Sequence, residues 1–356
     1  MSVSATVAVH TAGQDGITMQ EVILPSPTGH QVLVTIEASG LCRSQLRQMT
    51  LHGSGAPYLL GHEGVGVVAE VGPDVRDLNV GDRVVVTWIP VTGEGVRTPQ
   101  WATVDLGDGV VAETIDGIFT WGTHTLVDES FLVPLTAADT DPALSLVGCA
   151  LITGLGSAVY VGECSLGENV VVIGAGGVGL AAIAGAACAG AAQVLAVDID
   201  DAALALAREL GATSTLNSRT SDLVEHVRAT MGRGGMRGAD LVIDCVGETL
   251  TANQALECAR PAIQGSGIGG RVVVAGVREV PITFEGAQFV IDQKRITGAL
   301  AGGMGRREIL TTLDAIRSGR VNVGGMVTET ARLADLGKAV ERLRRGEIHG
   351  RALVVS

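Results

Sequence analysis

Residues 170–198 constrain the fold of this chain more than any other stretch, because they carry a strand, a glycine-rich turn, a helix and a second strand in one run. The apolar sequence VVVI comes first and GAGGVG follows it. An alanine-rich segment then continues to residue 189, and a second apolar strand ends at Asp198. A Gly-x-Gly-x-x-Gly turn between strand and helix, with an acid about 20 positions further on, is typical of a dinucleotide-binding βαβ unit. The alternative, a glycine-rich packing turn without a ligand, fits this context less well.

Each glycine of the turn has its own physical role in such a unit. Gly174 permits the tight turn, Gly176 lets the backbone approach a pyrophosphate, and Gly179 lets the helix pack close to the sheet. The free N–H groups at the helix N-terminus then face the phosphates. Asp198 stands where a carboxylate accepts hydrogen bonds from both ribose hydroxyls and repels a 2′-phosphate, which predicts NAD(H) over NADP(H). The predicted cofactor contacts here are Gly174, Gly176, Gly177, Val178, Gly179 and Asp198.

Composition predicts a globular protein with a large core. Of the 356 residues, 46% are hydrophobic and 18% are charged, a length that allows about two domains. The net charge of −13 argues against nucleic acid or an anionic membrane as the main partner. The N-terminus lacks the basic start and apolar core of a signal peptide, and the most apolar run is explained by the nucleotide-binding unit, so no membrane span is expected. The six cysteines form no C-x-x-C pair, which favours a cytoplasmic protein with reduced or metal-bound thiols.

The order of strand and helix patterns predicts one domain inserted into another. Short Val- and Ile-rich runs separated by glycines, in residues 1–40, 61–75 and 80–88, indicate a compact β-barrel. Residues 89–118 show no clear period and indicate a lobe or long loop, and a helix is predicted to begin near Asp141. Beyond residue 150, strands alternate with helices, which predicts a parallel sheet covered on both faces. We therefore predict a nucleotide-binding domain over 151–295 inserted into a discontinuous domain of residues 1–150 and 296–356, to which the last strand returns.

Three residues outside the nucleotide-binding core have the chemistry of a zinc site: Cys42, His62 and Cys149. A Cys₂His set leaves the fourth tetrahedral position open to water or substrate, as a catalytic zinc requires. Their spacing alone does not identify such a site, because an isolated cysteine is usually a small buried hydrophobic residue. That ordinary interpretation applies to Cys164, Cys188, Cys245 and Cys258, and the corresponding one, an ordinary surface or core histidine, to His10, His30, His124, His226 and His349.

The motifs GLCRS, GHEGVGVVAEVG, VGDRVV, VGC, VVVIGAGGVGL and VDID occur in this order. With them the chain resembles the zinc-dependent medium-chain alcohol dehydrogenases over essentially its full length. The resemblance implies a GroES-like β-barrel catalytic domain and an inserted Rossmann domain with a doubly wound parallel sheet, the active site lying in the cleft between them. It implies that Cys42, His62 and Cys149 bind one catalytic zinc.

The resemblance also implies further roles by motif position. Glu63 would be the acid that can transiently approach the metal, and Ser44 would hydrogen-bond the substrate oxygen and start proton transfer. The cofactor pyrophosphate would be held by Arg43 and Arg351, and the cofactor cleft would be lined by Val246 and Gly247. The substrate pocket would include Trp88, with Arg47 and His52 as further candidates, and Phe119 and Trp121 would lie near the cleft mouth or in the core.

Three departures from the family pattern affect this assignment. The lobe over residues 91–118 has no cysteine, so we predict no structural zinc and a lobe held by packing or by a dimer. Gln45 replaces the usual aspartate behind the zinc-bound histidine. A neutral amide accepts the imidazole N–H without adding charge, which predicts a retained but weaker or retuned zinc. Arg47 replaces a histidine that often ends the proton relay, and arginine cannot act as a base. Protons then leave through ordered water, or the substrate needs no relay; Arg47 either faces an anionic group of the substrate or is a solvated surface residue.

These observations predict a zinc-dependent oxidoreductase that transfers a hydride between NAD(H) and a primary or secondary alcohol or its aldehyde or ketone. One alternative is a reductase of the same fold that acts on a conjugated C=C or C=N bond. Another is a non-catalytic nucleotide-binding protein. We expect a cytoplasmic homodimer or homotetramer joined at the predicted edge strand 295–300, with a small-molecule substrate and neither nucleic acid nor membrane as partner.

Overall fold

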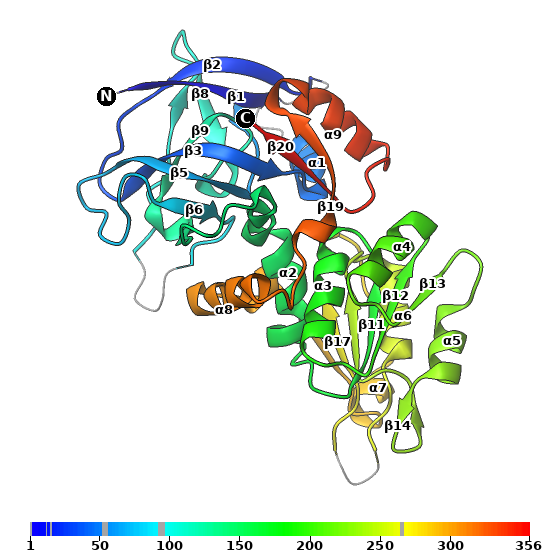
Figure 1. Cartoon of the computed structure of the whole chain (residues 1–356). Coiled ribbons are helices and arrows are strands. Elements are labelled where there is room, and N and C mark those ends of the chain that lie inside the picture. Colours follow the sequence, from blue (N-terminus) through cyan, green and yellow to red (C-terminus); the bar gives the residue numbers. More distant parts are fainter. Residues whose placement is uncertain (1, 12, 15, 52–55, 92–96, 264–266) are drawn as a thin grey trace. The chain divides into compact units, whose positions relative to one another are not determined.

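The computed structural model describes residues 2–11, 13–14, 16–51, 56–91, 97–263 and 267–356 (Figure 1). This part of the chain divides into two compact units. The first comprises Met1–Cys149, Gly305–Leu313 and Val327–Ser356, and the second comprises Ala150–Met304 and Asp314–Met326.

The second unit extends beyond the boundary that was predicted at residue 295. Strand β18 (Arg295–Gly298) pairs in parallel with β17 (Arg271–Val274), so it continues the sheet of the second unit. The last strand behaves as predicted: β20 (Arg351–Val355) returns to the first unit, where it pairs with β3 (Gln31–Gly40). The chain therefore enters the first unit, leaves it, and comes back to complete its sheet.

The first unit is built from two β-sheets, as the GroES-like prediction requires. A five-stranded sheet has the order β2-β1-β4-β8-β7, and a seven-stranded sheet has the order β10-β6-β5-β3-β20-β19, with β9 also paired to β3. Alternating Val, Ile and Leu side chains fill the interior of the unit, because successive residues of a strand point to opposite faces. The remaining strands are β1 (Val3–Thr11), β2 (Thr18–Leu24), β4 (Pro57–Leu59), β5 (Gly64–Val71), β6 (Arg83–Val86), β7 (Val104–Asp105), β8 (Val111–Thr114), β9 (His124–Asp128), β10 (Leu132–Pro134) and β19 (Val327–Arg332).

Two α-helices of the first unit pack against its β-structure, α1 (Arg43–Leu51) and α9 (Leu336–Arg344). Helix α9 carries its apolar residues on one face, as expected for a helix on the surface of a core. A third helix, α8 (Arg306–Arg317), begins in the first unit and ends in the second. Short 3₁₀ turns complete the unit, at Ile115–Gly117, Glu129–Phe131, Pro142–Gly148 and Leu333–Asp335.

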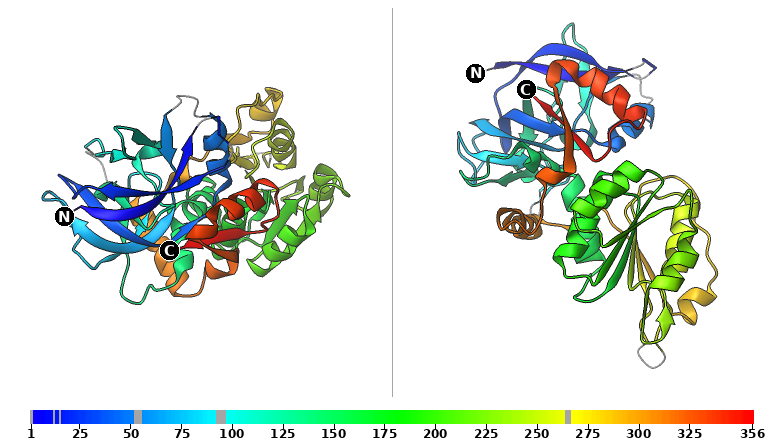
Figure 2. Two further views of the ribbon diagram at one scale, coloured as in Figure 1. Left: turned by 90° about the horizontal axis from the view of Figure 1, so that it is seen from above. Right: turned by 45° about the vertical axis from the view of Figure 1, so that its right-hand side comes forward.

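The second unit is a doubly wound parallel sheet, as predicted. Its six strands have the order β13-β12-β11-β16-β17-β18 and all pair in parallel. This order reverses between β11 and β16, which is the arrangement of a Rossmann fold. Figure 2 shows helices on both faces of the sheet. The other strands of this sheet are β11 (Asn169–Ile173), β12 (Gln193–Asp198), β13 (Ser214–Asn217) and β16 (Leu241–Asp244), and β14 (Gly232–Arg233) and β15 (Met236–Arg237) form a separate antiparallel pair. The α-helices are α2 (Ala150–Gly156), α3 (Gly177–Cys188), α4 (Asp201–Glu209), α5 (Leu223–Thr230), α6 (Thr249–Cys258) and α7 (Ala287–Val290).

The helix that was predicted from Asp141 onward is broken into pieces. The Asp141 side chain caps a 3₁₀ segment, Pro142–Gly148, by accepting a hydrogen bond from the Ala143 N–H. Cys149 then leaves helical geometry, with φ −144° and ψ −67°, before α2 begins. No single helix in the described residues is long and apolar enough to cross a membrane. The segments Pro142–Gly148 and Ala150–Val161, which are bent by 58° relative to each other, are long and apolar enough only when they are taken together.

The lobe over residues 91–118 contains more structure than its sequence indicated. Strands β7 and β8 pair within it and join the five-stranded sheet. Within the lobe, the Arg97 guanidinium makes two hydrogen bonds to the buried Asp128 carboxylate, at 2.6 and 2.9 Å. The backbone N–H of Gln100 donates to the same carboxylate at 2.7 Å. The lobe is therefore fastened to the strand end at Asp128 by an ion pair as well as by packing.

Candidate metal centre and nucleotide-binding turn

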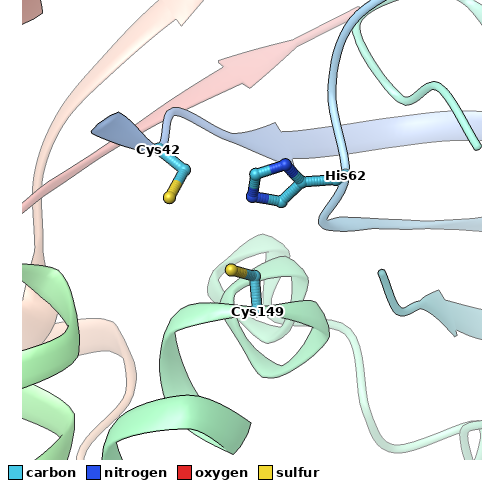
Figure 3. A group of neighbouring side chains, drawn as sticks. All are labelled: Cys42, His62 and Cys149. Carbon is cyan, nitrogen blue, oxygen red and sulfur yellow. The ribbon is translucent and has the colours of Figure 1, made fainter. Parts of the chain in front are cut away.

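The three predicted zinc ligands converge in the first unit (Figure 3). Cys42 lies in the bend between β3 and α1, His62 lies between β4 and β5, and Cys149 lies at the break before α2. Their exposed fractions are 8%, 7% and 8%, and their ligand atoms all lie within 4.8 Å of one another. Three segments far apart in sequence thus present two sulfurs and one imidazole to a single point.

This donor set fits a zinc ion. Zinc prefers sulfur and nitrogen ligands at about 2.0–2.3 Å, which places neighbouring ligands of a tetrahedron about 3.5 Å apart. The two sulfur atoms and the imidazole nitrogen lie within 4.8 Å of one another, so they need to move only slightly closer to reach this spacing. Three protein ligands then leave one position of the tetrahedron open. Hard oxygen-loving ions such as Mg²⁺ do not favour two thiolates. Cys42, His62 and Cys149 are therefore suited to hold a zinc that keeps a position for substrate.

The thiol of Cys42 differs electrostatically from the cysteines outside this cluster. A hydrogen bond with Cys149, only partly opposed by burial and reinforced by His62 and Arg351, holds the pKa of Cys42 well below its ordinary value. Burial instead raises the pKa of Cys164 to about 11 and that of Cys258 to about 12. Thiolate is the form that binds metals, so the contrast separates a ligand from ordinary buried thiols.

Two further residues predicted from the family pattern lie beside the cluster. The Ser44 hydroxyl donates a hydrogen bond to Cys42 Sγ at 3.0 Å and lies 3.3 Å from His62 Nε2. The side chain of Glu63, which is fully buried, forms an ion pair with Arg351, itself 4% exposed. Arg351 thus has a carboxylate partner within the first unit, and its contact with a pyrophosphate stays a prediction, as does that of the exposed Arg43 at the start of α1.

The amide of Gln45 is oriented differently from the expectation. Its Oε1 accepts a hydrogen bond from the Gly61 N–H at 2.6 Å, and its Nε2 faces Nδ1 of His62. Nε2 also donates to Gln48 Oε1 at 2.5 Å. The sequence predicted an amide that accepts the imidazole N–H; the structure shows an amide that donates to the ring, because the Gly61 backbone has taken the carbonyl.

The glycine turn of the second unit has the geometry that its sequence predicted. Gly174 has φ +92°, a left-handed conformation that glycine adopts without strain. A Cβ on Gly179 would lie 1.7 Å from the Gly174 carbonyl oxygen, so α3 approaches the strand closely only because that position is glycine. Nothing lies within 4 Å of a Cβ built on Gly176, at the N-terminus of α3, so the helix start is open there.

Asp198 ends β12 beside this turn. Its Oδ2 accepts a hydrogen bond from the Ala175 N–H at 2.6 Å, and its Oδ1 accepts from the Ile199 N–H at 2.7 Å. The carboxylate is therefore held at the carboxyl edge of the sheet, next to the start of α3. That is the position from which an acid contacts the ribose of a dinucleotide.

Val246 and Gly247 follow β16, the strand on the other side of the point where the strand order reverses. Val246 Cγ2 lies 2.8 Å from the position of a Cβ on Gly174, so the two loops meet at this switch point. Both backbone N–H groups donate to Asp244 Oδ1, at 2.9 and 3.1 Å. Ligands of open α/β sheets bind at such switch points, and the lining role of this pair stays a prediction.

The predicted substrate-pocket residues have different fates. Trp88 follows β6, and its buried indole N–H has no acceptor among the described residues. Arg47 lies half-buried on α1, whereas His52 falls outside the described residues. Phe119 and Trp121 are fully buried, and the Trp121 indole N–H donates to the Gly40 carbonyl at 3.1 Å. These two aromatic residues belong to the core, which was one of the two predicted alternatives.

Sequence reasoning missed several residues that support the sites. Gln48 was given no role, Asp244 was not identified as the acceptor behind Val246, and the Glu63–Arg351 pair was not predicted. The first contact follows from helical spacing, since Gln45 and Gln48 are three positions apart in α1 and so share a face. The other two depend on contacts that sequence patterns do not specify.

Comparison with known proteins agrees with the fold and the site. The family model for the alcohol dehydrogenase GroES-like domain matches residues 28–137, and that for zinc-binding dehydrogenases matches residues 177–318. The chain is 26% identical over 379 residues to an S-(hydroxymethyl)glutathione dehydrogenase of Paracoccus denitrificans, with 98% of each chain covered. It is 29% identical over 352 residues to an alcohol dehydrogenase B of Mycobacterium tuberculosis, with 92% of each covered.

Solved structures show the same architecture. An alcohol dehydrogenase zinc-binding domain protein from Burkholderia ambifaria superposes with a TM-score of 0.88 at 25% identity, covering 100% of this chain and 99% of that one. Benzyl alcohol dehydrogenase from Acinetobacter calcoaceticus gives a TM-score of 0.85 at 23% identity, with 99% of each chain covered, a likeness of fold. The two family models account for both units, and the Cys42–His62–Cys149 cluster supplies the expected ligands. The chain belongs to the zinc-dependent medium-chain alcohol dehydrogenase family.

Proposed function

We propose that this protein is a zinc-dependent oxidoreductase that transfers a hydride between NAD(H) and a primary or secondary alcohol or its aldehyde or ketone. The observation that carries the proposal is the convergence of Cys42, His62 and Cys149 within 4.8 Å in a chain that also has a dinucleotide-binding turn. When bound, zinc supplies Lewis-acid polarisation of a substrate oxygen and nicotinamide supplies the hydride acceptor or donor. Relatives named as alcohol dehydrogenases support the same class of reaction.

The protein's own residues hold the proton that such a reaction moves. Ser44 is exposed, and its Oγ lies beside Cys42 Sγ and His62 Nε2. This Oγ can receive a proton from a substrate hydroxyl and pass its own to solvent. Arg47, one turn further along α1, offers only N–H donors and no acceptor atom, so it does not take that proton on. We therefore propose that the proton leaves from Ser44 through water rather than along a side-chain relay.

We propose NAD(H) rather than NADP(H) as the cofactor. Hydrogen bonds from the Ala175 and Ile199 N–H groups hold the Asp198 carboxylate at the edge where a ribose would lie. A fixed negative charge there favours two ribose hydroxyls and disfavours a 2′-phosphate. A solved structure of the same fold, a putative zinc-binding dehydrogenase from Sinorhizobium meliloti at 22% identity, is bound to NADP, so the cofactor choice needs its own test.

The test combines metal content with hydride transfer. Protein purified without chelator is expected to contain about one zinc per chain by elemental mass spectrometry, because the described residues bring together one cluster of suitable ligands. At least one alcohol or aldehyde of a substrate panel is then expected to be turned over, measured as the change in absorbance of the reduced nicotinamide. Turnover is expected to be clearly faster with NAD(H) than with NADP(H). Zinc-free protein without hydride transfer to any alcohol or carbonyl substrate would contradict the proposal. A content of about two zincs would contradict the predicted absence of a structural zinc.

The same-fold reductase of a conjugated C=C or C=N bond is the second candidate. The observation that favours it is the orientation of the Gln45 amide, which donates to Nδ1 of His62 instead of accepting from it as the partner of a metal-bound imidazole would. Product analysis separates the two functions, since reduction of an enone gives a saturated ketone in one case and an allylic alcohol in the other.

We also propose a cytoplasmic homodimer or homotetramer that joins at the free edge of β18. Large apolar side chains are exposed near this edge, with exposed fractions of 73% for Val290, 75% for Ile291 and 72% for Leu300. Exposed apolar side chains can form an interaction site, and an open strand edge is a template for pairing. Light scattering of the wild-type protein is expected to give two or four times the mass of one chain. The double variant Ile291→Lys/Leu300→Lys is expected to give the mass of a single chain. The control is Leu166→Lys, since Leu166 is 84% exposed elsewhere in the same unit. A wild-type monomer would contradict the proposal.

A further inference from the structure

The Gln45 side chain is buried behind His62 with every amide hydrogen directed at an acceptor. Gln45 is 2% exposed. Its carbonyl accepts from the Gly61 N–H at 2.6 Å, one amide hydrogen goes to Gln48 Oε1 at 2.5 Å, and the other faces His62 Nδ1. A primary amide has two N–H donors, and both are used in this arrangement.

This arrangement decides which nitrogen of His62 carries the proton. Nδ1 receives an N–H, so it must be the bare nitrogen of the ring, and the ring proton lies on Nε2. Nε2 lies 3.3 Å from Ser44 Oγ, and the Ser44 hydroxyl donates to Cys42 Sγ at 3.0 Å. Donors and acceptors therefore alternate without conflict from Gln48 to Cys42.

A zinc ion at the cluster reverses this requirement. Nε2 is the nitrogen that faces Ser44 and Cys42, so it is the one that must be bare to bind metal, and the proton then belongs on Nδ1. An Nδ1–H needs an acceptor, but it meets the Gln45 N–H. Rotating the Gln45 amide turns its carbonyl to His62 and its NH₂ to the Gly61 N–H, which loses a buried hydrogen bond. Two N–H groups, of Gly61 and His62, compete for one carbonyl.

We propose that Gln45 and Gln48 are positioning residues that hold His62 as the Nε2–H tautomer in the metal-free protein and thereby weaken zinc binding. The inference rests on the proposed metal site and adds a residue pair that sets its affinity. Gln48 acts through Gln45: its carbonyl accepts the second amide hydrogen and so favours the observed orientation. The backbone of Gln48 is itself fixed, since the buried Tyr58 hydroxyl donates to its carbonyl oxygen at 3.0 Å.

Two variants that add the same charge three positions apart test the proposal. Gln45→Glu keeps the side-chain length and offers two acceptor oxygens, one for the Gly61 N–H and one for an Nδ1–H. We expect it to bind zinc about 10–100-fold more tightly than wild type, measured by competition with a chelator of known affinity. Gln48→Glu places a carboxylate where it accepts from the Gln45 N–H and holds the present orientation, so we expect no tightening. Equal tightening in both variants would mean a simple effect of negative charge and would overturn the proposal, as would no tightening in either.

A second readout does not require metal. Nitrogen-15 NMR of imidazole-labelled, metal-free protein distinguishes the two tautomers of His62. We expect Nε2–H in wild type and in Gln48→Glu, and a shift toward Nδ1–H in Gln45→Glu; Nδ1–H in wild type would overturn the inference. If Gln45→Glu alone binds zinc more tightly but the protein shows no hydride transfer, this inference is supported and the proposed function is contradicted. Zinc-dependent hydride transfer, with the same zinc affinity in both variants and wild type, would support the proposed function and overturn this inference.

Discussion

Replacing Cys149 by alanine is expected to abolish stoichiometric zinc binding and to lower kcat/KM for alcohol oxidation by about 10³-fold or more. Metal polarisation of a substrate oxygen contributes several kcal/mol to transition-state stabilisation, and about 4 kcal/mol corresponds to 10³ in rate. Elemental mass spectrometry and steady-state kinetics measure the two effects. The fold is expected to survive, because the change removes one sulfur atom at a residue that lies between two helical segments.

The matched control is Cys258→Ala, at a cysteine that is also buried but lies outside the cluster. Cys258 is 0% exposed, and burial raises its pKa to about 12, as expected for a thiol that packs as a hydrophobic residue. This variant is expected to keep its zinc and its activity, with at most a modest loss of stability. Retention of zinc and activity in Cys149→Ala, or equal losses in the two variants, would show that Cys149 is not a ligand.

The parts of the structure that the sequence predicted are those governed by local geometry. Gly174 and Gly179 have backbone requirements that few other residues satisfy, so the strand, turn and helix follow from the order of residues. The alternation of strands and helices predicted the parallel sheet, because each pattern is also visible within a short stretch of sequence. The predicted zinc ligands are different, because Cys42, His62 and Cys149 come together only through the fold, and the family resemblance rather than their spacing led to the prediction.

The features that the sequence did not predict depend on long-range contacts. Glu63 pairs with Arg351, from the other end of the chain, and Arg97 of the lobe pairs with Asp128 at the end of β9. The orientation of the Gln45 amide depends on a backbone N–H at Gly61, which leaves no trace in side-chain patterns. The helix predicted from Asp141 shows the same limit, since its apolar residues continue across the break at Cys149 while the backbone does not.

The lobe is held by an ion pair between Arg97 and Asp128 in addition to packing. Asp128 has a fully buried side chain, whereas that of Arg97 is 35% exposed. Burial raises the pKa of Asp128, but hydrogen bonds from Arg97 and from the Gln100 and Ser130 N–H groups outweigh it and leave the pKa below its ordinary value. The same contact raises the pKa of Arg97. The carboxylate thus joins the lobe, the arginine and the end of β9 in one network.

Asp128→Asn is expected to destabilise the protein by about 2 kcal/mol at neutral pH, less than the 3–5 typical of a buried pair because Arg97 is partly solvated. Asp128 has a depressed pKa in the folded state, so its contribution is present above the unfolded value of about 4 and is lost as pH falls through the folded value. Urea unfolding at pH 7 measures the loss, and the gap to wild type is expected to narrow below about pH 4 because asparagine does not titrate. Asp74→Asn, at an exposed acid of the same unit, is the control and is expected to change stability by less than about 0.5 kcal/mol. A gap that is absent at pH 7, or that widens in acid, would show that the ion pair does not fasten the lobe.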